Sequence, residues 1–170
     1  MSRPPRTREK AVSAVEVIEQ ATALLRSSPL ETIALYYIGT LPFVVALIWF
    51  WADMSRSPDA AGRLAGSALL LSLLFVWMKV FHARFTMHLL AALGGHRSIP
   101  PLGRTILLQG AVQPWSLLIL PVAAILTLPF GWCFAFFHNI SAAAETELRP
   151  AVARGKSLAM LWPKIGRAHV

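Results

Sequence analysis

A stretch of forty residues, numbered 105–144, contains no Asp, Glu, Lys or Arg. Two more uncharged apolar runs, 32–52 and 64–78, precede it. A chain of 170 residues has too little interior to hide all three runs from water. A bilayer can accommodate them, because a helix of about 20 apolar residues crosses roughly 30 Å of hydrocarbon. The sequence therefore predicts an all-α integral membrane protein with about three transmembrane helices.

Basic residues give the chain a formal net charge of +8, and they cluster beside the apolar runs. At these positions they would meet anionic phospholipid head groups. No soluble segment combines a basic face with interleaved aromatic residues, so we expect a lipid bilayer and membrane proteins as partners and no nucleic acid. The candidate head-group contacts are Lys79, Arg84, Arg97 and Arg104.

The N-terminal region divides into a polar tail and an amphipathic helix. Residues 1–10 are basic and Pro-containing, which is typical of a disordered tail. Residues 11–27 place apolar side chains at helical spacing on one face, namely Ala11, Ala14, Val15, Ile18, Ala21 and Leu25. This helix is too polar to span, and we expect it to lie at the bilayer surface. Packing on a soluble partner domain is the alternative.

The first two spans are expected at about 29–52 and 62–81. Ser28, Pro29 and Glu31 form a helix start in which Ser28 caps and Glu31 completes a capping box. Pro42 removes a backbone donor in mid-span and should kink the helix. The second helix should run past residue 81 until Gly94-Gly95 ends it. Within it, Gly62 and Gly66 form a small-xxx-small pair that can favour close helix approach.

The third span is expected at about 114–137, after a short surface helix at 104–112. A single straight helix over 105–137 would be roughly 50 Å long, so a break at Pro114 is predicted. Pro121 and Pro129 leave a re-entrant hairpin as the alternative. An amphipathic segment at 139–162 follows, with Pro150 marking a break or a restart.

The basic residues in the segments between the spans predict the orientation of the chain in the membrane. Residues 1–29 and 79–104 hold five and four bases, whereas the turn 53–63 holds two bases and two acids. We therefore expect the N-terminus to be cytoplasmic in a plasma (inner) membrane protein. One conflict follows, because a full third crossing puts the four bases of 138–164 outside. We expect a full crossing, and a third segment that turns back is the alternative.

A short sequence motif occurs twice. Thr-Leu-Pro-Phe stands at 40–43 and again at 127–130, each time inside an expected span that a proline starts after a surface helix, and 156–163 begins a similar unit. Chance in a Leu- and Pro-rich membrane chain is the alternative. Together with Phe136-Phe-His-Asn-Ile-Ser-Ala-Ala-Ala and the basic helix after it, the pattern over 11–164 resembles uncharacterised bacterial multi-pass proteins. That group is related to the membrane domain found beside some glycerophosphodiester phosphodiesterases. The resemblance implies a membrane domain that is not itself the hydrolase.

The last six residues, Ile-Gly-Arg-Ala-His-Val at 165–170, resemble the translation of a sequencing-adaptor oligonucleotide. We therefore interpret the membrane domain as C-terminally truncated near residue 164 and exclude this hexapeptide from the fold. A natural basic C-terminus is the alternative interpretation.

Chemistry-bearing residues are sparse, and the sequence nominates no catalytic, metal-binding or cofactor-binding residue. His82 and His88 are six apart and do not share a helical face. Glu145 and Glu147 are two apart and point to different faces, so they do not form an acid–base pair. Cys133 stands among aromatic residues, which favours a buried inert thiol over palmitoylation.

These observations favour a non-enzymatic multi-pass membrane module, such as an accessory or assembly subunit. A fragment of a permease is the alternative, because proline-broken helices often line substrate sites. A membrane-bound lipid enzyme would need carboxylates and histidines clustered at the interface, which the sequence does not offer.

Overall fold

The computed structural model describes residues 14–94, 99–125, 130–142, 145 and 147–161, and within them it is entirely helical. The expected tail 1–10, Arg97 and the hexapeptide 165–170 lie outside the described residues. Three of the helices are long and apolar enough to cross a membrane, namely α2, α3 and α4, which confirms the predicted class. The helices are α1 (Ala14–Ser27), α2 (Leu30–Arg56), α3 (Ala60–Ala92), α4 (Leu102–Ile125), α5 (Phe130–Ala142) and α6 (Leu148–Ala159).

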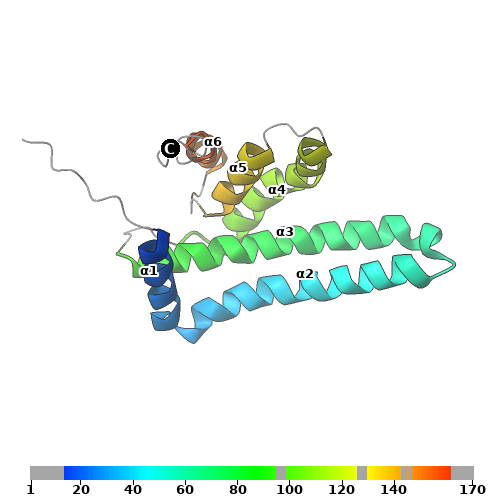
Figure 1. Cartoon of the computed structure of the whole chain (residues 1–170), viewed down its shortest axis with the longest axis horizontal. Helices are drawn as coiled ribbons and strands as arrows, with labels where there is room; N and C mark the ends of the chain where they lie inside the picture. The colour runs from blue at the N-terminus through cyan, green and yellow to red at the C-terminus, as the bar shows by residue number, and fades with distance from the viewer. Residues whose placement is uncertain (1–13, 95–98, 126–129, 143–144, 146, 162–170) are drawn as a thin grey trace, which may run out of the picture.

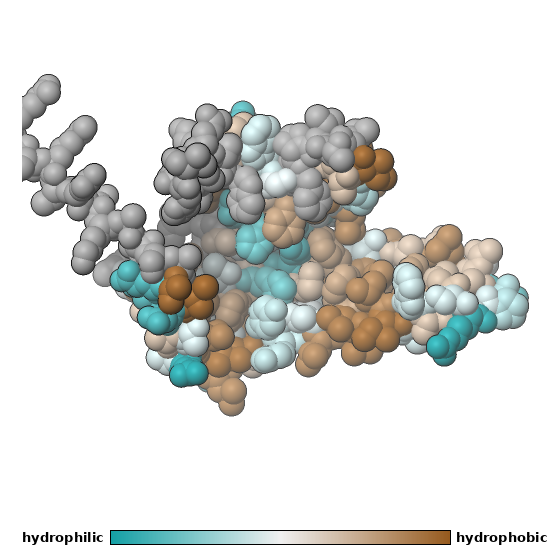
Figure 2. All heavy atoms as spheres, viewed as in Figure 1, coloured by the Kyte–Doolittle hydropathy of each residue, from teal (hydrophilic) through white to brown (hydrophobic). Residues whose placement is uncertain are grey.

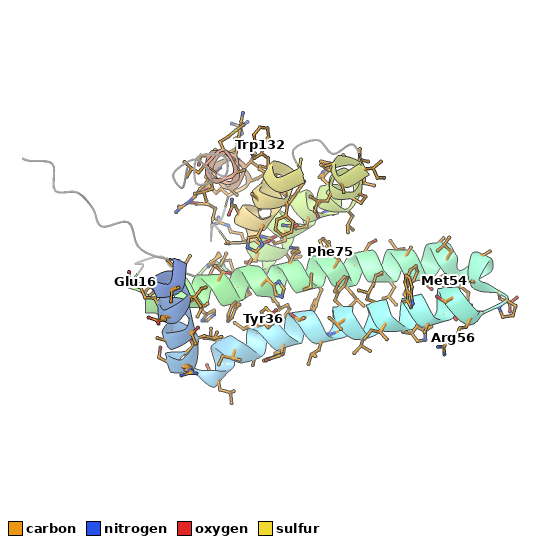
Figure 3. The ribbon with its side chains drawn as sticks, in the orientation of Figure 1. Glu16, Tyr36, Met54, Arg56, Phe75 and Trp132 are labelled. Carbon is orange, nitrogen blue, oxygen red and sulfur yellow. The ribbon has the colours of Figure 1, made fainter. Side chains whose placement is uncertain are left out.

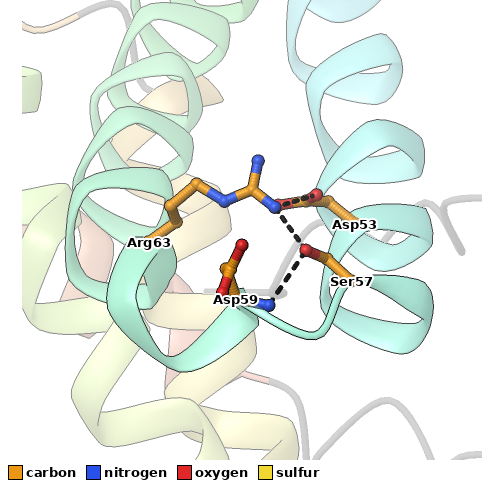
Figure 4. A network of polar contacts seen from close by, with 4 residues as sticks. All are labelled: Asp53, Ser57, Asp59 and Arg63. Carbon is orange, nitrogen blue, oxygen red and sulfur yellow. Dashed lines mark hydrogen bonds and ion pairs between the residues drawn. The ribbon is translucent and has the colours of Figure 1, made fainter.

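The longest element is the antiparallel hairpin of α2 and α3 (Figure 1). Its tight turn is held by Arg63, which pairs with Asp53 at 3.0 Å and donates to the Ser57 hydroxyl (Figure 4). The same hydroxyl accepts the backbone N–H of Asp59. As predicted, α3 continues past residue 81, and Gly94 follows its end with φ +81°. That left-handed conformation suits glycine and terminates the helix.

The close approach of α2 to α3 is made at Gly39. A Cβ atom there would lie 2.7 Å from the Cβ of Phe81 and 3.3 Å from the carbonyl oxygen of Met78. The small pair Gly62 and Gly66, expected to allow close packing, instead faces open space, with no atom within 4 Å of an added Cβ. The sequence motif was the wrong guide because the approach depends on what lies opposite a glycine.

Pro42 lies inside α2, and the helix continues through it. Since proline has no N–H, the carbonyl of Ile38 loses its usual helical donor. The indole N–H of Trp77 on α3 donates to this oxygen at 3.2 Å. The neighbouring helix thus satisfies the backbone group that Pro42 leaves free, which matters where no water is available.

This arrangement predicts an energetic coupling between Trp77 and Pro42. Trp77→Phe should lower the free energy of unfolding by about 0.5–1.5 kcal/mol beyond its packing loss, because the Ile38 oxygen is left unpaired. In a Pro42→Ala background the same change should cost less, since an alanine at this position supplies the missing backbone N–H. A double-mutant cycle in detergent, followed by SDS-induced unfolding, measures the difference; equal costs in both backgrounds would contradict it.

Helix α1 confirms the predicted amphipathic helix over its described residues and lies across the end of the hairpin (Figure 1). Its apolar residues Val15 and Ile18 are 65% and 64% exposed, as expected for a surface that meets lipid. The proposed cap at the start of α2 is wrong. The Ser28 hydroxyl donates to the Leu24 carbonyl and so closes α1, while Pro29 precedes α2 without a side-chain cap.

The third apolar run differs most from expectation. Instead of a surface helix, a break at Pro114 and a span over 114–137, α4 runs unbroken from Leu102 to Ile125. A second helix, α5, then begins at Phe130. Packing on both sides of the proline holds α4 together, since Thr105, Leu108 and Val112 before it and Ser116 after it are all buried.

The same boundaries affect the repeat. Its first copy lies inside α2, whereas α4 ends at Ile125, before the second copy, and Phe130 opens α5. Residues 126–129 lie outside the described residues. Of the second copy, the described residue Phe130 begins α5 and does not continue α4.

The expected amphipathic segment 139–162 is divided between the end of α5 and α6. Pro150 stands in the first turn of α6, in agreement with a restart. The buried stripe of α6 consists of Ala151, Gly155 and Ala159, whereas the larger Leu148 and Val152 are 49% and 37% exposed. Small residues allow α6 to lie close to α5, where a Cβ on Gly155 would meet the Ile140 side chain at 2.9 Å.

The interior of the molecule lies where α4 and α5 cover part of α3. In α3 the buried residues are Val80, Ala83 and Met87, all in the half that ends at Ala92. The other described helices do not cover the rest of the hairpin. Only 6% of the most apolar window is buried in α2, and the same share is buried in α3. On the visible face, apolar residues lie over the middle of the hairpin and hydrophilic ones at its turn and at α1 (Figure 2).

Candidate functional site: a buried amide cluster

The most unusual feature of the interior is a polar cluster between α4 and α5. Gln109, Gln113 and Ser116 of α4 are at most 1% exposed, and Ser141 of α5 is 6% exposed. The two glutamines are one helical turn apart, so their side chains lie on the same face of α4. Apolar residues of the same interface, including Val112, Phe137 and Ile140, surround them.

The cluster is joined by hydrogen bonds across the two helices. The Nε2 of Gln113 lies 3.0 Å from the Gln109 Oε1, 3.0 Å from the Ser141 hydroxyl and 3.2 Å from the Phe137 carbonyl oxygen. Ser141 donates in turn to the Gln109 Oε1 at 3.2 Å. One amide thus connects α4 to both the backbone and a side chain of α5, which fixes how the two helices pack.

Among the residues that the structure describes, three buried polar atoms of α4 have no hydrogen-bond partner: the Thr105 hydroxyl, the Gln109 Nε2 and the Gln113 Oε1. A buried amide or hydroxyl without a partner costs about 1–3 kcal/mol. The cluster holds neutral donors and acceptors only, so it can bind water or a neutral polar group. Its hydrogen bonds also hold α4 against α5, as polar side chains between helices do in membrane proteins.

A second polar contact joins α2 to α3 near the start of the hairpin. The Thr40 hydroxyl lies 2.8 Å from the His82 Nε2 and also donates to the Tyr36 carbonyl. The rings of Tyr36 and His82 stack with centroids 4.8 Å apart. Figure 3 shows Tyr36 between the two helices and Trp132 on the side of α5 away from them. His82 is therefore a packing residue of this seam.

The three expected head-group contacts that the structure describes do not form one cluster. Lys79 is half-buried within α3, with its Nζ 5.4 Å from the ring centre of Phe75. Arg84 donates to the Pro100 carbonyl at 3.1 Å, and Arg104 is exposed near the start of α4. Arg97 lies outside the described residues. Of the three described residues, Arg104 is the exposed one and can therefore reach a lipid phosphate most easily.

The remaining chemistry-bearing residues are dispersed. Cys133 is half-buried and lines an apolar cavity between α4, α5 and α6. His138 stacks on Phe134 and is exposed. Glu145 pairs with Arg154 at 3.0 Å, while Glu147 precedes α6. Over the described ranges, no three His, Cys, Asp or Glu side chains are placed to hold a metal.

Sequence reasoning missed the amide cluster. A signal was present, because Gln109 and Gln113 are four apart in a run without charges. Placing the break at Pro114 assigned Gln109 to a surface helix at 104–112 and left Gln113 at the start of the third span, where neither glutamine needs a partner. No family model, curated protein or solved structure matches this chain.

Proposed function

We propose that the chain is a non-enzymatic multi-pass membrane module that acts as an accessory or assembly subunit. Its α2–α3 hairpin would pack against helices of other membrane proteins, while α4 and α5 brace one half of it.

The single observation that carries this proposal is that the three long helices are buried to different extents within the protein. The most apolar window of α4 is 33% buried, against 6% in α2 and in α3. In the first half of α3, Leu69 and Leu73 are 63% and 61% exposed, and Gly62 and Gly66 have open space beside them. Exposed small residues between apolar ones are what a helix interface in a membrane requires.

Site-specific photocrosslinking in cells tests the assembly role. A photoreactive amino acid at Leu69 or Leu73 should give a discrete protein adduct, because these side chains would face a partner helix. The matched position is Val112 on α4, which is buried against Phe137 of the same chain and should give none. Adducts with lipid alone at both α3 positions would contradict the proposal.

A permease is the second candidate, and the unpartnered atoms of Gln109, Gln113 and Thr105 favour it. They lie on a helix that contains Pro114 and Pro121, and broken or proline-containing helices often line solute sites. A neutral cluster suits a neutral hydroxylated solute. Glycerol flux into proteoliposomes, followed by light scattering, should exceed that of protein-free liposomes and fall in Gln109→Leu. Equal flux with and without protein would exclude this candidate for glycerol.

A further inference from the structure

The helix α5 is too short to cross a bilayer. Its 13 residues rise about 20 Å, against roughly 30 Å of hydrocarbon. It also runs back along α4. Gln109 and Gln113 contact Ser141 near the end of α5, Gln113 also reaches Phe137, and Ile119, later in α4, lines one cavity with Cys133 near the start of α5. The end of α5 is therefore directed toward the surface at which α4 starts.

The charges on α6 limit how deeply α4 can enter the bilayer. It carries Arg149, Arg154 and Lys156, all exposed. Had α4 crossed the whole bilayer, the short α5 would leave these bases inside hydrocarbon, where charged residues are strongly disfavoured. Figure 1 instead shows α6 crosswise to the α2–α3 hairpin and toward the end that carries α1, away from the tight turn.

Basic residues agree with this placement. The segments 1–29, 79–104 and 138–164 hold five, four and four Lys or Arg residues, and the turn 53–63 holds two. Short cytoplasmic segments are enriched in these residues. A full crossing by α4 would move one of the three basic segments to the outside, whereas a hairpin that returns keeps all three on one side.

We propose that α4 and α5 form a re-entrant hairpin and that α6 lies on the cytoplasmic surface, on the same side of the bilayer as α1, bound to anionic phospholipid head groups. Arg149 and Lys156 carry the lipid contact, because residues seven apart share one side of a helix. Ala151 and Gly155 turn the adjoining side toward α5. Arg154 is engaged by Glu145.

Thiol labelling in intact cells tests the topology. In a Cys133→Ser background, single cysteines at Ser157 and Ala153 of α6 and at Ser27 of α1 should resist an impermeant maleimide. A cysteine at Ser55, exposed near the hairpin turn, should react. A permeant maleimide should label all four, which verifies folding and accessibility. Reaction of Ser157→Cys and Ala153→Cys with the impermeant reagent would overturn the re-entrant hairpin.

Hydrogen exchange of the α6 amides tests the lipid contact. In nanodiscs containing phosphatidylglycerol they should exchange more slowly than in phosphatidylcholine alone. Each base near an anionic surface contributes about fivefold in binding, so Arg149→Gln with Lys156→Gln should remove roughly 25-fold of this protection. The matched control, Arg56→Gln at the opposite end, should leave it unchanged. Equal exchange in both lipids would overturn the head-group contact while leaving the topology to the labelling result.

Discussion

Replacing Gly39 by leucine should separate α2 from α3 and lower the free energy of unfolding by about 3 kcal/mol or more. Even a methyl group at this position would lie 2.7 Å from the Phe81 Cβ and 3.3 Å from the Met78 carbonyl oxygen. Neither atom is the far end of a flexible side chain, so the helices themselves must move. Adding atoms to a packed site typically costs about 1–3 kcal/mol, and here the whole seam of Tyr36, Thr40 and His82 would be displaced.

The matched control is Gly66→Leu. Gly66 lies in α3 of the same hairpin, yet nothing lies within 4 Å of its added Cβ. Leucine is also a better helix former than glycine, so this variant should be neutral or slightly more stable. SDS-induced unfolding of both variants in one detergent gives the comparison. Equal losses in the two variants would show that glycine replacement, not helix contact, sets the cost.

The comparison of these two glycines shows what the sequence could and could not predict. The apolar runs of α2 and α3 were evident because charged residues flank them, and the spans expected from them, 29–52 and 62–81, were long enough to cross a bilayer. Which glycine mediates contact was not evident. A glycine permits close approach, but the register of the opposing helix decides whether one occurs.

The third apolar run shows a second limit. The absence of charge over 105–144 says that the segment avoids water, and it does not say where the chain turns. Prolines looked like the natural breaks, yet α4 passes through Pro114 and Pro121 because its other side chains are packed. Tertiary contacts overrode local propensity. The assignment of Gln109 to a surface helix was therefore wrong, and so was the helix start expected at Gln113 and Pro114.

The buried face of α6 could not be predicted from the sequence for a related reason. Large apolar residues are usually taken to mark the buried face of an amphipathic helix. Here Ala151, Gly155 and Ala159 are buried because a short distance to α5 leaves room only for small side chains. In a bilayer, exposed Leu148 and Val152 carry no penalty, so the usual sign of the buried face loses its meaning.

Gln113→Leu should be strongly destabilising on its own and much less so when its partners are changed with it. The single variant removes the donor that serves Gln109, Ser141 and the Phe137 carbonyl. Unpaired buried polar groups cost about 1–3 kcal/mol each. We therefore expect a loss of about 2–3 kcal/mol, seen as a lower midpoint of SDS-induced unfolding and greater protease access to α5.

The triple variant Gln109→Leu, Gln113→Leu, Ser141→Ala removes donors and acceptors together, so only the Phe137 carbonyl is left to compensate. Its unfolding free energy should recover to within about 1 kcal/mol of the parent, because a matched apolar replacement of hydrogen-bonded partners can be nearly neutral. Losses that simply add would contradict a mutually satisfied cluster. A triple variant that is stable yet abolishes glycerol flux would instead assign the amides to a solute, since adhesion of α4 to α5 would then be intact without them.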